Sequence, residues 1–99
     1  METSYKSATN TKTRVKKPPK YKVIIYNDDY TTMEFVVDIL ITIFNKTIEE
    51  ANNLMLDVHV KGQGIAGIYV HNIAVTKANE TIRRARSEGF PLKVGVESE

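Results

Sequence analysis

The sequence contains no cysteine, which excludes a disulfide framework and any metal site built on thiolate ligands. A reducing compartment is therefore permitted. The chain also lacks any run of about 20 apolar residues, the length that a membrane-spanning helix requires. Its first residues carry no apolar segment of the kind found in signal peptides, so we expect a protein that is neither secreted nor embedded in a membrane.

Signatures of an enzyme are equally scarce. The glycine-containing stretch GQGIAG (62–67) comes before an expected strand instead of joining a strand to a helix, so it does not predict a phosphate-binding loop. Nucleophilic catalysis needs a serine or cysteine held by a base, and the serines lie only near the two ends of the chain. Asp28, Asp29 and His59 could form a metal site or an acid/base pair, but His59 has no histidine four residues later and His71 lies on another element. We expect no catalytic residue, no metal and no cofactor.

Positive charge is concentrated at the start of the chain. The 99 residues, 41% hydrophobic and 26% charged, suit a single soluble domain. Residues 1–20 carry six basic side chains and one acidic one, whereas the remainder carries eight basic and eleven acidic ones. The first segment has too few apolar groups to offset its ordering entropy. We predict a flexible basic arm over residues 1–20 and a folded, mildly acidic domain over residues 21–97, which argues against a nucleic-acid-binding fold.

Hydrophobic periodicity predicts six elements in the order β-α-α-β-α-β. The β-branched stretch YKVIIYN predicts a buried first strand, and glycine-rich and proline-bounded segments predict strands near residues 65–71 and 91–96. Apolar residues at helical spacing predict helices over residues 33–44, 48–59 and 72–88. The expected fold is α+β, with a small antiparallel three-stranded sheet packed against three helices.

The helix ends carry recognisable capping signals. Thr31 with Glu34, and Thr47 with Glu50, have the T-x-x-E spacing of a capping box, so we expect them to begin the first two helices. We expect Asn72 to cap the third helix, and Gly89 to end it in a left-handed conformation.

The segment YNDDYTTMEF (26–35) places two adjacent acids after the first strand and before the first helix. One interpretation is a solvated turn in which Asn27 or Asp28 bonds its own backbone. Another is a binding site. If the first two helices form an antiparallel hairpin, the start of one lies beside the end of the other. The polar groups of Asn27, Asp28 and His59 would then rim an apolar pocket, suited to a ligand with a cation next to an apolar group. The walls of that pocket would be Met33, Val36, Met55 and Val58.

Three motifs at their separations resemble the ClpS family of bacterial adaptors: NDDYTTMEFVVDIL, A-x-x-L-M-L-x-V-H and G-x-G-I-A-G-I-Y. The resemblance covers residues 21–96. It implies a non-enzymatic, monomeric, cytoplasmic adaptor, with a plastid stroma as the less favoured location. Such an adaptor binds polypeptides with a free N-terminal Leu, Phe, Tyr or Trp (N-degrons). It delivers them to a ClpA- or ClpC-type AAA+ unfoldase for degradation by ClpP.

The resemblance also implies a role for each candidate residue. Asn27, Asp28 and His59 would hold the α-amino group, and Asp29 and Thr31 the peptide backbone. Met33 would act as a gatekeeper that excludes β-branched Ile and Val. The wall of the side-chain pocket is expected to comprise Met33, Val36, Met55, Val58 and Leu92.

Two positions depart from the family pattern. Thr32 stands where the family often has proline. Both residues are tolerated in the first turn of a helix, so we expect no change in function. Asn72 replaces a glutamate on the surface expected to contact the unfoldase, whereas the basic partner is kept as Lys77. A ribosome-associated interaction module, with the basic arm touching RNA, is the alternative function that we consider.

Overall fold

The computed structural model describes residues 17–99. Most of the predicted arm, residues 1–16, lies outside the described residues, so the prediction of a flexible arm stays a prediction. The first strand begins at Lys20, one residue before the predicted start of the domain, and the last strand ends at Ser98, one residue after its predicted end.

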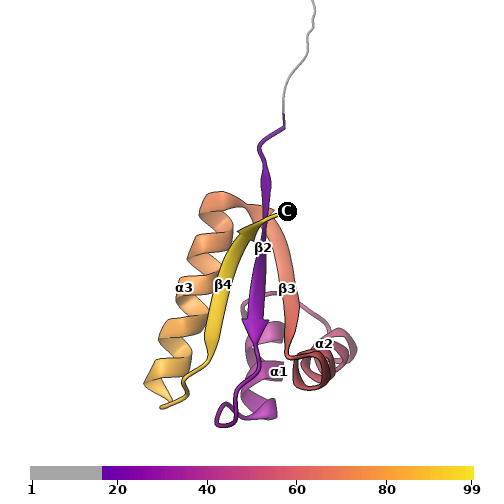
Figure 1. The fold of residues 1–99 in the computed structure, drawn as a ribbon, viewed down its shortest axis with the longest axis vertical. Coiled ribbons are helices and arrows are strands. Elements are labelled where there is room, and N and C mark those ends of the chain that lie inside the picture. The colour runs from indigo at the N-terminus through magenta and orange to yellow at the C-terminus, as the bar shows by residue number, and fades with distance from the viewer. Residues whose placement is uncertain (1–16) are drawn as a thin grey trace, which may run out of the picture.

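The three strands form one antiparallel sheet in the order β3-β2-β4. The strand β2 (Lys20–Tyr26) lies in the middle, between β3 (Gln63–Val70) and β4 (Lys93–Ser98). Tyr26 pairs with Gln63 on one side and with Lys93 on the other. The end of β2 therefore lies beside the starts of both neighbours, and the chain leaves the sheet there towards the first helix (Figure 1).

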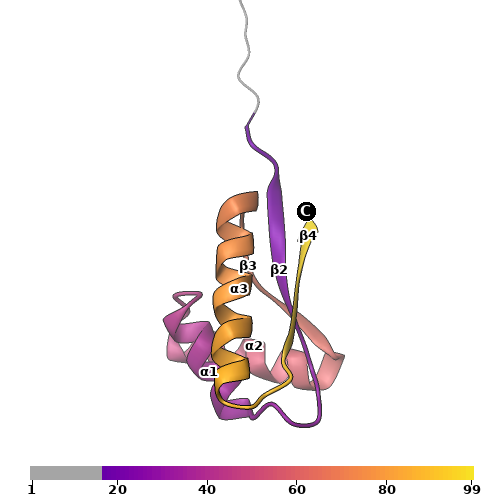
Figure 2. The ribbon, with the colours of Figure 1, turned by 90° about the vertical axis from the view of Figure 1, so that its left-hand side faces the viewer.

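The three helices are α1 (Met33–Thr42), α2 (Ile48–Lys61) and α3 (His71–Ser87). They cover one face of the sheet, as the edge-on view in Figure 2 shows. In Figure 1 α2 is seen nearly end-on and α1 from the side, so the two helices cross instead of forming the antiparallel hairpin that we considered. The predicted α+β class and the β-α-α-β-α-β order are confirmed.

A single apolar core lies between the sheet and the helices. Val23 and Ile25 point from β2 into it, because alternate residues of a strand face the same side. Phe35 of α1 packs edge-to-face on Phe90 with the ring centres 5.1 Å apart. This packing brings the chain that follows α3 against the start of α1. Both segments lie next to the turn that joins β2 to α1.

The start of α1 differs from the prediction by one residue. The N-cap is Thr32, whose hydroxyl accepts a hydrogen bond from the backbone N–H of Phe35 at 3.1 Å. The capping box predicted for Thr31 and Glu34 is therefore wrong, because Thr31 is used by the preceding turn. The capping box of α2 is confirmed. There the hydroxyl of Thr47 accepts from the N–H of Glu50, whose carboxylate accepts from the N–H of Thr47.

The third helix, by contrast, begins earlier than predicted. Its N-cap is Val70, with no side-chain capping bond, and Asn72 lies inside the first turn, so the prediction of Asn72 as the cap is wrong. The end is as expected, since Gly89 has a φ of +80°, the left-handed region that glycine enters at little cost.

Candidate functional site

The site forms where the end of β2 is fastened to the end of α2. The backbone N–H of Asn27 donates to the carbonyl of Gly62 at 2.9 Å. Gly62 ends α2 with a φ of +91°, and its own N–H donates to the carbonyl of Val58. Gly64 also lets the helix come close, because a Cβ at this position would lie 2.9 Å from a Val58 methyl. These contacts hold the last turn of α2 beside Asn27.

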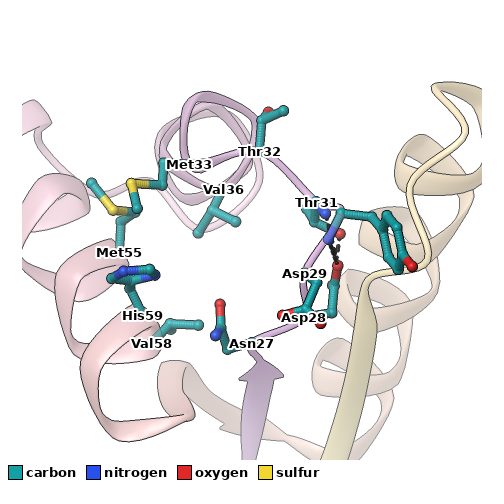
Figure 3. A pocket seen from close by; sticks show the side chains of 11 residues that line it. Asn27, Asp28, Asp29, Thr31, Thr32, Met33, Val36, Met55, Val58 and His59 are labelled. Carbon is teal, nitrogen blue, oxygen red and sulfur yellow. Dashed lines mark hydrogen bonds between the residues drawn. The ribbon is translucent and has the colours of Figure 1, made fainter.

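The two acids of the NDD motif follow Asn27 in a tight turn. One carboxylate oxygen of Asp28 accepts from the backbone N–H groups of Tyr30 at 2.8 Å and of Thr31 at 2.7 Å. The other oxygen accepts from the Thr31 hydroxyl at 2.7 Å. These bonds appear as dashed lines in Figure 3. The interpretation of this segment as a turn held by its own side chain is therefore correct for Asp28.

This turn keeps the Asp28 carboxylate charged. Partial burial by itself would raise its pKa, but the hydrogen bonds from Thr31 and Tyr30 and the nearby Arg86 outweigh burial and lower the pKa below its ordinary value. Arg86 also donates to the carbonyls of Phe90 and Leu92, at 3.0 and 2.9 Å. The same guanidinium therefore supports both the anion and the loop behind it.

A pocket of about 400 Å³ opens between this turn, the start of α1 and the end of α2. Figure 3 shows Val36 and Val58 pointing into it from the two helices, with Asn27 beside Val58 and the acidic turn on the opposite side. Val36 and Val58 are buried, and Met55 is half-buried. Asn27, Asp29 and His59 are exposed, so the rim is largely polar and accessible, with Met33 as its exposed apolar member, and the floor is apolar. The lining residues are Asn27, Asp28, Asp29, Tyr30, Thr31, Thr32, Met33, Val36, Met55, Val58 and His59.

The structure thus brings together nearly all of the residues selected for this pocket. Leu92 is the exception. It is not among the residues that line the pocket, and its side chain is 1% exposed within the core, so its place in the wall stays a prediction. Tyr30 and Thr32 line the pocket and were not predicted to do so. Their place between predicted site residues was the available signal, since a tight turn presents consecutive residues to one cavity.

The two residues expected to contact an unfoldase lie elsewhere, on α3. Asn72 is exposed, but Lys77 is only partly so. The Lys77 ammonium donates to the carbonyl of Ile43 at 2.6 Å, and it lies 5.4 Å from the centre of the Tyr69 ring. Lys77 therefore ties α3 to the end of α1, a structural role that the sequence did not reveal. A contact with a partner remains a prediction for both residues.

Within residues 17–99, no group of three histidine, aspartate or glutamate side chains is arranged to hold a metal ion. In the same part of the chain, none of the helices has both the length and the apolar character needed to cross a membrane.

Comparison with known proteins identifies the family. The family described as "ATP-dependent Clp protease adaptor protein ClpS" matches residues 16–95. The chain belongs to the ClpS family. The ClpS adapter of Desulforapulum autotrophicum is 50% identical over 100 residues, which span 99% of this chain and 96% of that protein. The ClpS adapter of Clostridium acetobutylicum is 49% identical over 94 residues, which span 95% and 93% of the two chains.

A solved structure shares the fold. Agrobacterium tumefaciens ClpS2 bound to L-phenylalaninamide superposes with a TM-score of 0.81 at 35% identity, covering 84% of this chain and all of that one. The family predicted from the sequence motifs is therefore confirmed. Family membership also favours the adaptor over the ribosome-associated module.

Proposed function

We propose that this ClpS-family protein binds polypeptides through a free N-terminal Leu, Phe, Tyr or Trp and delivers them to the Clp protease. The observation that carries the proposal is the pocket itself, in which polar acceptors rim a buried apolar floor. Phenylalaninamide, which ClpS2 binds, has groups complementary to such a pocket: its α-carbon carries both an ammonium group and an apolar side chain.

The polar rim receives the charged end of the ligand. The amide oxygen of Asn27 and a ring nitrogen of His59 accept hydrogen bonds from the ammonium, which has three donors. The Asp28 carboxylate adds negative charge, although the turn already occupies both of its oxygens. Water can relay its remaining acceptor capacity.

The turn also contacts the peptide that follows the first residue. The Thr31 hydroxyl donates its hydrogen bond to the Asp28 carboxylate, so its oxygen is left to accept from a peptide N–H. Asp29 is exposed at the mouth and offers a carboxylate to the same strand of backbone. The apolar side chain of the first residue fills the space among Met33, Val36 and Val58.

The expected affinity follows from these contacts. Burying a Leu or Phe side chain contributes about 1.5–3 kcal/mol. Each hydrogen bond to the ammonium contributes roughly 1.5–3 kcal/mol. Against an association cost of at least about 4 kcal/mol, the upper values of these contributions support binding in the micromolar range.

Three fluorescent peptides that differ only at the first residue test the proposal by anisotropy. A peptide beginning with Leu binds, whereas its N-acetylated form loses most of its affinity because it has no cation and fewer donors. A peptide beginning with Ile also fails to bind, because its β-branch meets Met33. Equal binding of all three peptides would show that the pocket recognises neither the free amino group nor the side chain of the first residue.

The partner in delivery is an AAA+ unfoldase of the ClpA or ClpC type, contacted through Asn72 and Lys77. The relatives are named as adapters of a protease, and accordingly the protein carries substrates and does not cleave them. A monomer in the bacterial cytoplasm completes the proposal, since a shuttle that hands over its cargo has no need of self-association.

A further inference from the structure

A second cavity lies against the first and shares a wall with it. It is a groove of about 290 Å³ between α1 and α2, lined by Met33, Glu34, Val37, Asn52 and Met55. Met33 and Met55 line the larger pocket as well. These two side chains, seen at one edge of the pocket in Figure 3, therefore form the partition between the two cavities.

This partition is the part of the pocket wall that can move. Methionine is unbranched and has three rotatable bonds, so it adapts to its surroundings. Met33 is 45% exposed, whereas the facing valines, Val36 and Val58, are 6% and 4% exposed. Their β-branched side chains are stiff and lie against the core. A bulky group that enters the pocket consequently displaces Met33 before it displaces either valine.

The groove offers the space into which Met33 can move. Val37 is half-buried and forms one side on α1, and Asn52 faces it from α2. The Asn52 amide donates to the carbonyl of Ile48 at 3.0 Å. This bond holds the Asn52 side chain along its own helix, where it does not fill the groove.

We propose that Asn52 is a positioning residue that sets the upper size limit of the N-terminal side chain. It does so by leaving the groove free for Met33 when an indole ring occupies the pocket. The inference rests on the proposed function, because it concerns the range of N-terminal residues that the same pocket accepts. A leucine side chain is smaller than an indole and requires less displacement of the gate.

The test compares Asn52→Phe with Asn53→Phe, using peptides that begin with Leu or Trp and are otherwise identical. Both substitutions place the same ring at an exposed position of α2, but Asn53 does not line the groove. In Asn52→Phe the affinity for the Trp peptide falls about tenfold, the lower part of the range expected for overpacking. The affinity for the Leu peptide stays near that of the wild type, and Asn53→Phe changes neither.

A double mutant shows whether the effect of Asn52→Phe depends on Met33. When Met33 is already Ala, the side chain that moves into the groove is absent, so adding Asn52→Phe should no longer separate the two peptides. An equal loss for both peptides, no loss, or a selective loss that persists without Met33 would each overturn the inference. If the wild-type protein binds neither peptide, the proposed function itself fails, and that result is distinct from a failure of the groove.

Discussion

Asp28 combines two roles that substitution can separate: it holds the turn from residue 28 to 31, and it supplies charge to the rim of the pocket. Asp28→Ala removes both. The variant loses three hydrogen bonds, and each bond to a charged group contributes roughly 1.5–3 kcal/mol. Two of the bonds share one oxygen and the group is only half-buried, so their contributions do not add. We expect the free energy of unfolding to fall by about 2 kcal/mol.

Asp28→Asn removes the charge and keeps most of the turn. The amide oxygen can accept from both backbone N–H groups, and the amide nitrogen can donate to the Thr31 hydroxyl. The free energy of unfolding should therefore fall by less than about 1 kcal/mol. Binding of a Leu peptide should weaken about tenfold or more, because a charge-assisted contact is roughly twice as strong as a neutral one.

Urea unfolding and peptide anisotropy measure these two effects independently. Asp57→Asn is the matched control, since it makes the same change of charge on the outer surface of α2, outside the pocket. If Asp28→Asn binds the Leu peptide with wild-type affinity, the charge of Asp28 has no role in binding. A loss of stability as large as that of the alanine variant would refute our account of the turn.

Three further predictions concern the gate, acid stability and the surface of α3. Met33→Ala should admit peptides that begin with Ile or Val, and continued rejection of both in the anisotropy assay would remove Met33 from the gate. Burial raises the pKa of Asp28, but the hydrogen bonds outweigh burial and lower this pKa below its ordinary value. The charged Asp28 therefore contributes to stability above about pH 4, and this contribution is lost at lower pH. The unfolding curves of the wild type and Asp28→Asn should therefore converge in acid. Lys77→Ala should lower the free energy of unfolding by about 1–3 kcal/mol because it leaves the Ile43 carbonyl without its donor, whereas Asn72→Ala should not; equal urea midpoints would contradict this.

The sequence predicted the order of the elements well because the periodicities are strong and the turns are marked. It placed the start of α1 wrongly because two adjacent threonines can each cap a helix. The deciding contact is the bond from Thr31 to Asp28, which commits the first threonine to the turn and leaves Thr32 to accept from Phe35. Competition of this kind between neighbouring side chains is settled by geometry that spacing alone does not contain.

The burial of Leu92 shows a second limit of sequence reasoning. It follows α3 and precedes β4, and Arg86 binds its carbonyl while its side chain enters the core. The segment from Phe90 to Leu92 does lie near the pocket, since Phe90 packs on Phe35 at the start of α1. Proximity in the chain and in space did not determine which way the side chain points.

The pocket could be predicted in spite of these errors because it depends on where the elements meet. The chain passes from α2 to β3 through Gly62, and β3 pairs with β2, so the end of α2 must lie beside the end of β2. The backbone bond from Asn27 to Gly62 fixes that junction. His59 lies one turn before Gly62, and helical spacing then directs Met55 and Val58 to the same region. The two helices cross instead of lying antiparallel. The short connection between β2 and α1 nevertheless places the start of α1 opposite the last turn of α2. The rim and the floor of the pocket therefore follow from the topology, whereas the room available behind Met33 depends on how the two helices pack.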